Sequence, residues 1–266
     1  MSAKAPGWRD VLRPVYYWGR YFRHRLAPRA TYAADNEDVA AGLLLGRISR
    51  FIDVGANDGI TLSNTTLLAL RGAQGLSFEP NAGDFRRVRE LYRWNRRVEC
   101  IEEGLSDASG TRQFRSDGLL SAMTDTEDPG LTKLLAGFTR ADAPLITIKV
   151  DKLSAWLDRR PAFVGCDVLS IDVEGHELNV LRGIDWSRHS KPARCLILET
   201  HSEGGSGGSW RHRDYDAIGE LLAGHDYLKL AANQNNTFWL HRADLDESRL
   251  AAARQRLPNF TWFPLS

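Results

Sequence analysis

Short apolar runs alternate with amphipathic segments along the chain from residue 35 onward. The amphipathic segments place apolar residues at helical spacing, as Phe85, Val88, Leu91 and Tyr92 do in AGDFRRVRELYRWNRR. Strands that alternate with helices predict a parallel sheet that helices cover on both faces. The predicted strands are FIDVG (51–55), GLSFEP (75–80), VECIEEGLS (98–106), DVLSID (167–172) and ARCLILET (193–200).

Two regions depart from this alternation. Near the C-terminus, the helix YDAIGELLAGH precedes YLKLAAN and NTFWLH, which are predicted to be two further strands. Residues 107–165 are interpreted as an insertion between the third and fourth strands, because the strand-like runs GTRQFRSD and PLITIKVD flank a polar, less regular stretch. We therefore expect an N-terminal extension (1–34), one α/β domain (35–245) and a C-terminal tail (246–266).

The composition is that of an ordinary globular domain. The 266 residues, 42% of them hydrophobic, are enough to bury one substantial core. A formal net charge of +1 gives no overall field that favours nucleic acid or an acidic partner. Cys100, Cys166 and Cys195 lack CxxC spacing and are expected to be reduced thiols. No apolar run approaches the ~18 residues of a membrane span, so we expect a soluble cytoplasmic protein.

Acidic residues end most of the predicted strands. In open α/β sheets, ligands bind at the edge formed by the carboxyl ends of the strands. A purely structural sheet has no need of charged groups there, so the pattern indicates a binding site. The residues at the five tips are Asp53, Glu79, Ser106-Asp107, Asp172 and Glu199.

The turn in FIDVGANDG has Gly55 and Gly59 between a strand and a helix. Glycine there permits a positive φ and a close approach of a ligand to the backbone. Asp53 and Asp58 would repel a pyrophosphate, so the turn suits a ligand with an ammonium, a sulfonium and an unphosphorylated ribose, as in S-adenosylmethionine. Glu79 can accept hydrogen bonds from both hydroxyls of a ribose, which fits that cofactor and NAD equally well.

The motifs FIDVGANDG, FEPN, EEGLSD, SIDVEGHELNVLRGIDW and LILETH, in this order, resemble those of the FkbM-type S-adenosylmethionine-dependent methyltransferases over residues 50–201. The resemblance implies a class I methyltransferase (Rossmann-like) α/β fold for residues 35–245. Its sheet would be mostly parallel, with helices on both faces and a C-terminal antiparallel hairpin. The resemblance also implies O-methylation of a hydroxyl on a sugar, glycan or polyketide-like small molecule.

Ten residues are predicted to bind the cofactor on these grounds. One of them, Asn81, has an open alternative as a simple turn residue after Pro80. The predicted cofactor-binding residues are Asp53, Gly55, Ala56, Asn57, Asp58, Gly59, Glu79, Asn81, Ser106 and Asp107.

The stretch SIDVEGHE (170–177) ends a predicted buried strand in acidic groups and an imidazole. An alcohol acceptor needs a base within hydrogen-bonding reach. His176 is the first candidate, because the N-terminus of a helix keeps its ring neutral. Glu177 is interpreted as a first-turn residue that the helix dipole favours without any function. The residues predicted to face the acceptor are His176, Asp172, Glu174, Glu199 and His201.

A divalent metal is an open alternative at this edge. Asp172 and Glu199 end neighbouring strands and could hold Mg²⁺, while His201 would favour a borderline metal. Direct contact of these side chains with the acceptor is the simpler interpretation, so we assign no metal ligand.

The N-terminal segment suggests a partner outside the domain. Residues 1–30 carry seven basic side chains, Lys4 and six arginines, against Asp10 alone. A basic helix of this kind can lie on an anionic membrane, or it can pack over the pocket or a second subunit. The residues predicted to share one side of this helix are Trp18, Tyr21, Phe22 and Leu26.

Two other features have plain alternatives. The arginines of the segment 85–97 fall mostly opposite its apolar stripe, which is typical of a solvated face and not of nucleic-acid binding. The loop EGGSGGSW, ending at Trp210, is a candidate lid or a surface loop. The competing functions are an NAD(P)-dependent oxidoreductase and a non-catalytic scaffold recruited to membranes.

Overall fold

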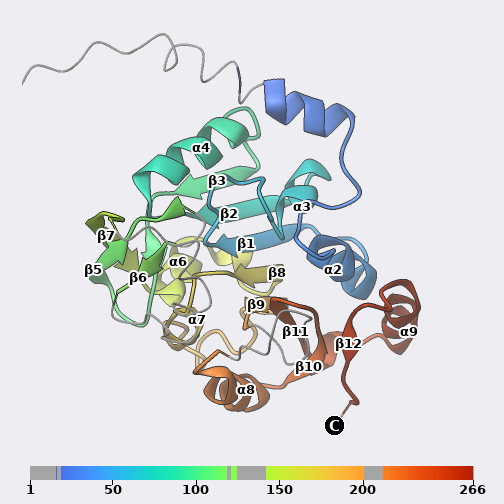
Figure 1. The fold of residues 1–266 in the computed structure, drawn as a ribbon. Helices are drawn as coiled ribbons and strands as arrows, with labels where there is room; N and C mark the ends of the chain where they lie inside the picture. The colour runs from blue at the N-terminus through green and yellow to red at the C-terminus, as the bar shows by residue number, and fades with distance from the viewer. Residues whose placement is uncertain (1–15, 17–18, 119–120, 125–141, 201–211, 266) are drawn as a thin grey trace, which may run out of the picture.

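The computed structural model describes residues 16, 19–118, 121–124, 142–200 and 212–265. Its main sheet has eight strands in the order β12-β10-β11-β9-β8-β1-β2-β3 (Figure 1). The strands are β1 (Arg50–Val54), β2 (Gln74–Phe78), β3 (Val98–Ile101), β8 (Cys166–Ile171), β9 (Ala193–Glu199), β10 (Tyr227–Ala232), β11 (Asn236–His241) and β12 (Thr261–Trp262).

Pairing in this sheet confirms the predicted fold. The pairs β3–β2, β2–β1, β1–β8 and β8–β9 are parallel. The strand β11 then runs antiparallel to both β9 and β10, which makes the expected C-terminal hairpin. The protein therefore has the mostly parallel α/β sheet of a class I methyltransferase.

Helices cover both faces of the sheet because the strands are apolar on both sides. In β1, Phe51 packs into one hydrophobic cluster and Ile52 into the other. The helices on the Phe51 face are α2 (Glu37–Leu45), α3 (Thr66–Leu70), α4 (Ala82–Tyr92) and α9 (Glu247–Arg256). Those on the Ile52 face are α6 (Leu153–Arg159), α7 (Glu177–Arg182) and α8 (Tyr215–Ala223).

A second, smaller sheet lies beside the carboxyl ends of the main strands (Figure 1). Its order is β4-β7-β5-β6, and β5 pairs antiparallel with both neighbours. The strands are β4 (Gly104–Leu105), β5 (Gly110–Arg115), β6 (Ala122–Met123) and β7 (Leu145–Asp151). Three of these strands come from the predicted insertion (107–165), but β4 precedes that range, and α6, which lies within it, packs on the main sheet. Short 3₁₀ turns, η2 (Pro161–Phe163) and η3 (Arg242–Asp244), follow α6 and β11.

The two ends of the chain pack onto the domain in ways that sequence spacing did not predict. After residue 245, α9 contacts α2 and β12 extends the main sheet at β10, so the tail is part of the fold. In the N-terminal helix, residues 19–26, Tyr21 and His24 are buried. Phe22 and Leu26 are 37% and 83% exposed, so the predicted stripe is wrong for them. Trp18 lies outside the described residues.

The helix α4 follows the predicted pattern. Phe85, Val88, Leu91 and Tyr92 are buried, and the arginines of the segment 85–97 are exposed, as expected of a solvated face. The three cysteines are free thiols. Among the helices that the structure describes, none is long and apolar enough to cross a membrane.

Candidate active site

One row of residues crosses the carboxyl ends of the strands. Asn236 pairs with Glu199 across β11 and β9. Asp172, Gly55 and Glu79 each follow the last paired residue of β8, β1 and β2, so they continue the row. Acidic side chains therefore stand on both sides of a glycine.

A cavity of about 370 Å³ lies above this row, within the range of roughly 300–1,000 Å³ that is usual for small-molecule sites. Apolar residues from the second sheet, including Phe114 and Met123, line it beside the polar row. Among the described residues that line the cavity, there is no lysine, arginine or histidine. The carboxylates that line it are Asp53, Glu79, Asp172, Glu174 and Glu199.

Gly55 lets the loops after β1 and β8 come together. Its φ is +89°, and a Cβ at this position would lie only 1.8 Å from the carbonyl oxygen of Asp172. Only glycine fits this close approach, as the sequence indicated. The following residues, Ala56 and Asn57, also line the cavity, and Asn57 has a φ of +49°.

Glu79 is held with both carboxylate oxygens in place. Oε2 accepts a hydrogen bond from the backbone N–H of Asn57 at 2.8 Å, and Oε1 accepts one from that of Asn81 at 2.7 Å. Burial raises the pKa of Glu79 to about 8. Each oxygen keeps a further lone pair, so the carboxylate can accept two hydroxyl donors of a ribose.

Asp53 is oriented by a residue that the sequence analysis missed. The hydroxyl of Thr65 donates a 2.7 Å hydrogen bond to Oδ2 of Asp53. Burial raises the pKa of Asp53 to about 7, and the nearby charge of Asp172 adds to this. A cationic ligand would relieve both effects.

Three carboxylates form what we call the acidic cluster: Asp172, Glu174 and Glu199. One oxygen from each lies within 4.8 Å of the others. Burial raises the pKa of Asp172 to about 6 and holds those of Glu174 and Glu199 well above their usual range. A side-chain hydrogen bond joins Asp172 and Glu199, so these two groups titrate as a pair that shares a proton. The same spacing would suit a divalent cation, with Glu174 added to the predicted pair.

Glu177 and His212 fix the loop that carries the acidic cluster. Oε1 of Glu177 accepts hydrogen bonds from the backbone N–H groups of Val173 (3.0 Å) and Gly175 (3.3 Å). Its Oε2 lies 2.8 Å from Nε2 of the buried His212. Burial favours the protonated acid, but the contacts with His212 outweigh it and hold the pKa of Glu177 below its usual value.

This arrangement explains the unusual backbone of the loop. Glu174 and Gly175 both have positive φ values, +53° and +99°, and the two N–H bonds to Glu177 stabilise that turn. Nδ1 of His212 accepts a hydrogen bond from the N–H of Asp214, which places the ring proton on Nε2, facing Glu177. The sequence pattern explains Glu177 only as a first-turn residue that the helix dipole favours, and it gives no sign of His212. Their contact joins segments that are distant along the chain.

His176 does not line the cavity, contrary to its predicted role as the base. Its side chain is fully buried, and Nε2 lies 2.9 Å from the hydroxyl of Ser106. That hydroxyl donates in turn to Asp107, which also pairs with Arg112 at 2.9 Å. Ser106 and Asp107 are likewise absent from the cavity wall, so these three residues tie α7 to the loop after β4.

Three other predicted cofactor residues, Asp58, Gly59 and Asn81, are also absent from the cavity wall. Asp58 accepts hydrogen bonds from the backbone of Ile60 and Thr61, so its carboxylate stabilises the turn. At Gly59, a Cβ would lie 2.7 Å from Val88, so this glycine permits packing on α4.

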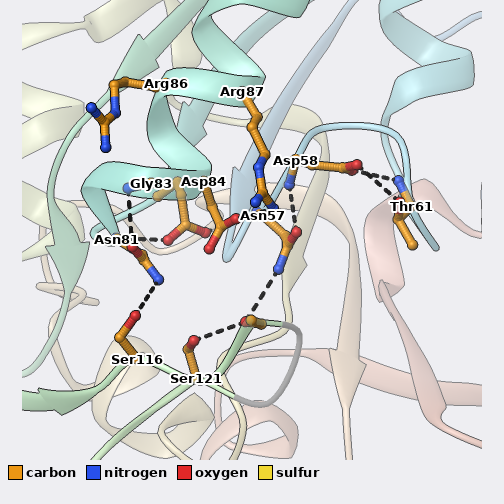
Figure 2. A network of polar contacts seen from close by, with 12 residues as sticks. Asn57, Asp58, Thr61, Asn81, Gly83, Asp84, Arg86, Arg87, Ser116 and Ser121 are labelled. Atoms are coloured by element: carbon orange, nitrogen blue, oxygen red, sulfur yellow. Dashed lines mark hydrogen bonds and ion pairs between the residues drawn. The ribbon is translucent and has the colours of Figure 1, made fainter. Parts of the chain in front are cut away.

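Asn81 is the N-cap of α4. Its Oδ1 accepts from the N–H of Gly83 at 3.0 Å, and its Nδ2 donates to Ser116 at 2.9 Å (Figure 2). The alternative interpretation of a turn residue therefore fits better than cofactor contact. His201, Trp210 and the candidate lid lie outside the described residues.

A buried hydrogen-bond acceptor at this edge favours a ligand that carries a hydrogen-bond donor. Asn236 is 4% exposed and lines the cavity; its Nδ2 donates to Glu37 at 2.8 Å. Its Oδ1 has no hydrogen-bond partner among the described residues. A buried amide oxygen without a donor is costly, so an ammonium or hydroxyl group in the cavity would stabilise it.

The chain matches one domain family and several solved structures. No curated protein matches the chain. A methyltransferase FkbM from Methylobacillus flagellatus KT shares 14% identity, with a TM-score of 0.46 over 87% of this chain and 60% of that chain. The METTL16 MTase domain shares 12% identity, with a TM-score of 0.44 over 77% of this chain and 66% of that chain.

Cofactor-bound Rv0187 from MTB shares 15% identity, with a TM-score of 0.42 over 90% of this chain and 99% of that chain. This chain thus spans less than two thirds of the length of the first two structures. The profile of the methyltransferase FkbM domain matches residues 53–229, about two thirds of the chain, and this range includes all five carboxylates of the cavity. The chain belongs to the FkbM methyltransferase domain family.

Proposed function

We propose that this protein is an S-adenosylmethionine-dependent O-methyltransferase that acts on a hydroxyl of a sugar, glycan or polyketide-like small molecule. Membership of a methyltransferase family implies S-adenosylmethionine as the donor, which supplies an electrophilic methyl group on a sulfonium. The observation that carries the proposal is the cavity itself: Glu79 stands at one end of its polar row and the acidic cluster at the other.

The residues on the β1 and β2 side fit the cofactor. Glu79 presents two oxygens that suit the ribose hydroxyls, and Gly55 brings the backbone close enough for a ligand to pack on it. Asp53 and Asp172 favour the ammonium and sulfonium charges. The apolar residues Leu105, Phe114 and Met123 can pack against a purine.

Asp172 replaces His176 as the base in this proposal. It lies between the loop after β1 and the other two members of the acidic cluster, and its pKa is raised to about 6, close to the range suited to a general base. A base with a pKa just below the working pH removes a proton effectively. Asp172 would accept the hydroxyl proton while the acceptor oxygen takes the methyl group and S-adenosylhomocysteine leaves as a thioether, and the hydrogen bond to Glu199 would hold Asp172 in position.

The charge of the cavity supports a neutral acceptor. Five carboxylates line it, and the described lining residues include no cationic side chain that would bind a phosphate or carboxylate. Coulomb repulsion in a partly enclosed site would weaken the binding of an anionic acceptor. A polyol can instead donate hydroxyl groups to Glu174 and Glu199, which fits a sugar or a hydroxylated small molecule.

The same charge argues against a nicotinamide-dependent oxidoreductase, because the pyrophosphate of NAD would approach Asp53 and Glu79. The intact cavity argues against a non-catalytic scaffold. Calorimetric titration of the full chain with S-adenosylhomocysteine and, separately, with NADH distinguishes the three functions. We expect saturable binding of the first alone.

Glu79→Gln tests the role of the carboxylate in this binding. We expect at least tenfold weaker binding of S-adenosylhomocysteine, because the ribose hydroxyls would favour the ionised carboxylate with two acceptor oxygens, whereas glutamine offers only one. Glu90→Gln is the matched control, because Glu90 lies on α4 outside the cavity and should leave the affinity unchanged. Binding of NADH alone would overturn the proposal, and binding of neither ligand would favour the scaffold. Transfer of labelled methyl to a panel of neutral polyols would then identify the acceptor class.

A further inference from the structure

A second cavity, of about 340 Å³, lies at the opposite end of the strands. Four arginines line it, and the described residues of its wall include no carboxylate. We propose that this arginine pocket, formed by Arg47, Arg50, Arg71 and Arg97, binds a phosphate-bearing anion. The site is separate from the proposed active site and does not depend on it.

The topology of the sheet brings the four arginines together. Arg50 begins β1 and pairs with Gln74, the first residue of β2. The carbonyl of Arg97 accepts a hydrogen bond from the N–H of Gly75 at 2.9 Å, which places Arg97 on the other side of Gln74. Neighbouring parallel strands lie about 4.8 Å apart, so Arg50 and Arg97 flank one strand. Arg47 and Arg71 enter from the C-terminal ends of α2 and α3.

Within the part of the chain that the structure describes, none of the four guanidinium groups forms an ion pair with a carboxylate. Asp167, which accepts hydrogen bonds from the backbone N–H groups of Ser49 and Arg50, is itself paired with Arg194 at 2.9 Å. Four like charges around one cavity repel each other, and an anion between them would remove that repulsion.

The simplest alternative is that these arginines only stabilise helix ends. The C-terminus of a helix carries an effective charge of about −0.5, so two ends offset roughly one positive charge. Four guanidinium groups therefore leave a net charge of about +3 around the cavity. The helix ends account for part of the cluster and leave an unbalanced positive charge, as expected of an anion site.

The chemistry of the wall favours phosphate. Guanidinium groups bind phosphate oxygens through paired N–H donors, and several of them around one centre suit a multivalent anion. Gly42 and Gly72 leave the wall open to a bulky oxyanion, and Ser49 and Gln74 offer further polar groups. The ligand class is therefore a compound with one or more phosphates.

Such phosphates could be soluble or belong to a lipid headgroup. The helix of residues 19–26 lies beside the pocket, since Arg25 donates a 3.1 Å hydrogen bond to the carbonyl of Leu70, next to Arg71. That helix exposes Phe22 and Leu26. Exposed apolar side chains beside a basic pocket are compatible with a membrane surface, so the test has one arm for each source.

The soluble arm is calorimetric titration of the full chain with pyrophosphate at fixed ionic strength. We expect saturable binding that weakens at least tenfold in Arg50→Gln/Arg97→Gln. The matched control is Arg86→Gln/Arg96→Gln, which removes the same charge from exposed positions outside the pocket and should change the affinity less than twofold. Unchanged binding of S-adenosylhomocysteine by both variants would show that the fold is intact.

The lipid arm is cosedimentation with phosphatidylcholine vesicles, with and without phosphatidylinositol bisphosphate. Binding to the phosphorylated vesicles alone, lost in Arg50→Gln/Arg97→Gln and kept in the control, supports the site with a lipid as its source. Binding of pyrophosphate without vesicle binding supports a soluble source. The proposal is overturned if neither probe binds the native chain, or if both double variants weaken binding equally.

Discussion

The two ends of the central strands differ in charge although the same strands form both. At the carboxyl ends, five carboxylates line a cavity of about 370 Å³. At the amino ends, four arginines line a cavity of about 340 Å³. In β1 these ends are separated by the five steps from Arg50 to Gly55, or roughly 16 Å. Basic and acidic residues nearly cancel in the formal net charge of +1, so the net charge alone does not indicate that the two ends carry opposite charges.

Parallel topology explains part of the difference. Every helix between two parallel strands begins near the carboxyl edge of the sheet and ends near the amino edge. Helix N-termini favour carboxylates and C-termini favour arginines, so a mild polarity of this sign is expected. The acidic end exceeds that expectation because its carboxylates are buried or half-buried, with raised pKa values in Asp53, Glu79 and Asp172. Burial of so many acids indicates a site for a cation.

The largest effect is expected when the acidic end loses the carboxylate of Asp172. We predict that Asp172→Asn lowers kcat by about 10²–10⁴-fold, the contribution typical of a general base. Binding of S-adenosylhomocysteine should weaken only a few-fold. Asp107→Asn is the control, because Asp107 lies outside the cavity and its loss should leave kcat nearly unchanged. Equal activities of Asp172→Asn and the native protein would remove Asp172 as the base.

Gly72 at the amino end and Gly55 at the carboxyl end allow the same substitution to be compared at the two ends. An alanine at Gly72 (φ +96°) meets no atom within 4 Å, so we predict a loss of about 1–2 kcal/mol in the free energy of unfolding from the positive φ alone. At Gly55 the same change also forces the backbone of Asp172 away, so the loss should exceed about 3 kcal/mol. Urea unfolding of Gly55→Ala and Gly72→Ala measures both. Equal losses would contradict the close approach seen at Gly55.

The buried acids should make stability depend on pH. The pKa of Glu79 is raised from 4.5 to about 8, so between these values the folded state binds more protons than the unfolded state. The free energy of unfolding therefore falls as pH rises from 5 to 8, by about 3–4 kcal/mol for this group. Glu79→Gln should flatten the dependence in urea titrations without ligand. An identical slope in the variant would show that Glu79 is ionised in the folded state.

The smallest effect is expected at the contact between His212 and Glu177, which positions the loop that carries Asp172 and Glu174. We predict that His212→Gln lowers kcat roughly tenfold, because the turn holding Glu174 loses part of its support while Asp172 itself remains. Binding of S-adenosylhomocysteine should stay within twofold. His189→Gln, which breaks another histidine–carboxylate pair away from the cavity, is the control and should leave kcat unchanged. A His212→Gln enzyme with native kcat would limit His212 to stability.

Local sequence determined the elements of this protein and the edge at which its site lies. The apolar runs specified the strands, because strands buried on both faces must be apolar throughout. The acidic residues that end them, Asp53, Glu79, Asp172 and Glu199, line one cavity, because the ends of adjacent parallel strands meet. These predictions needed only periodicity and the position of a charge at the end of a run.

Tertiary structure alone decided which neighbouring side chains face the cavity. Asp58 and His176 lie within a few residues of Gly55 and Asp172, yet the turns direct them into the protein, where Ile60 and Ser106 are their partners. The direction of a side chain in a turn follows from backbone angles that long-range contacts impose, such as the bonds from Glu177 to its loop. The arginine pocket was equally hidden, because its residues come from three separate segments whose proximity only the packed sheet creates.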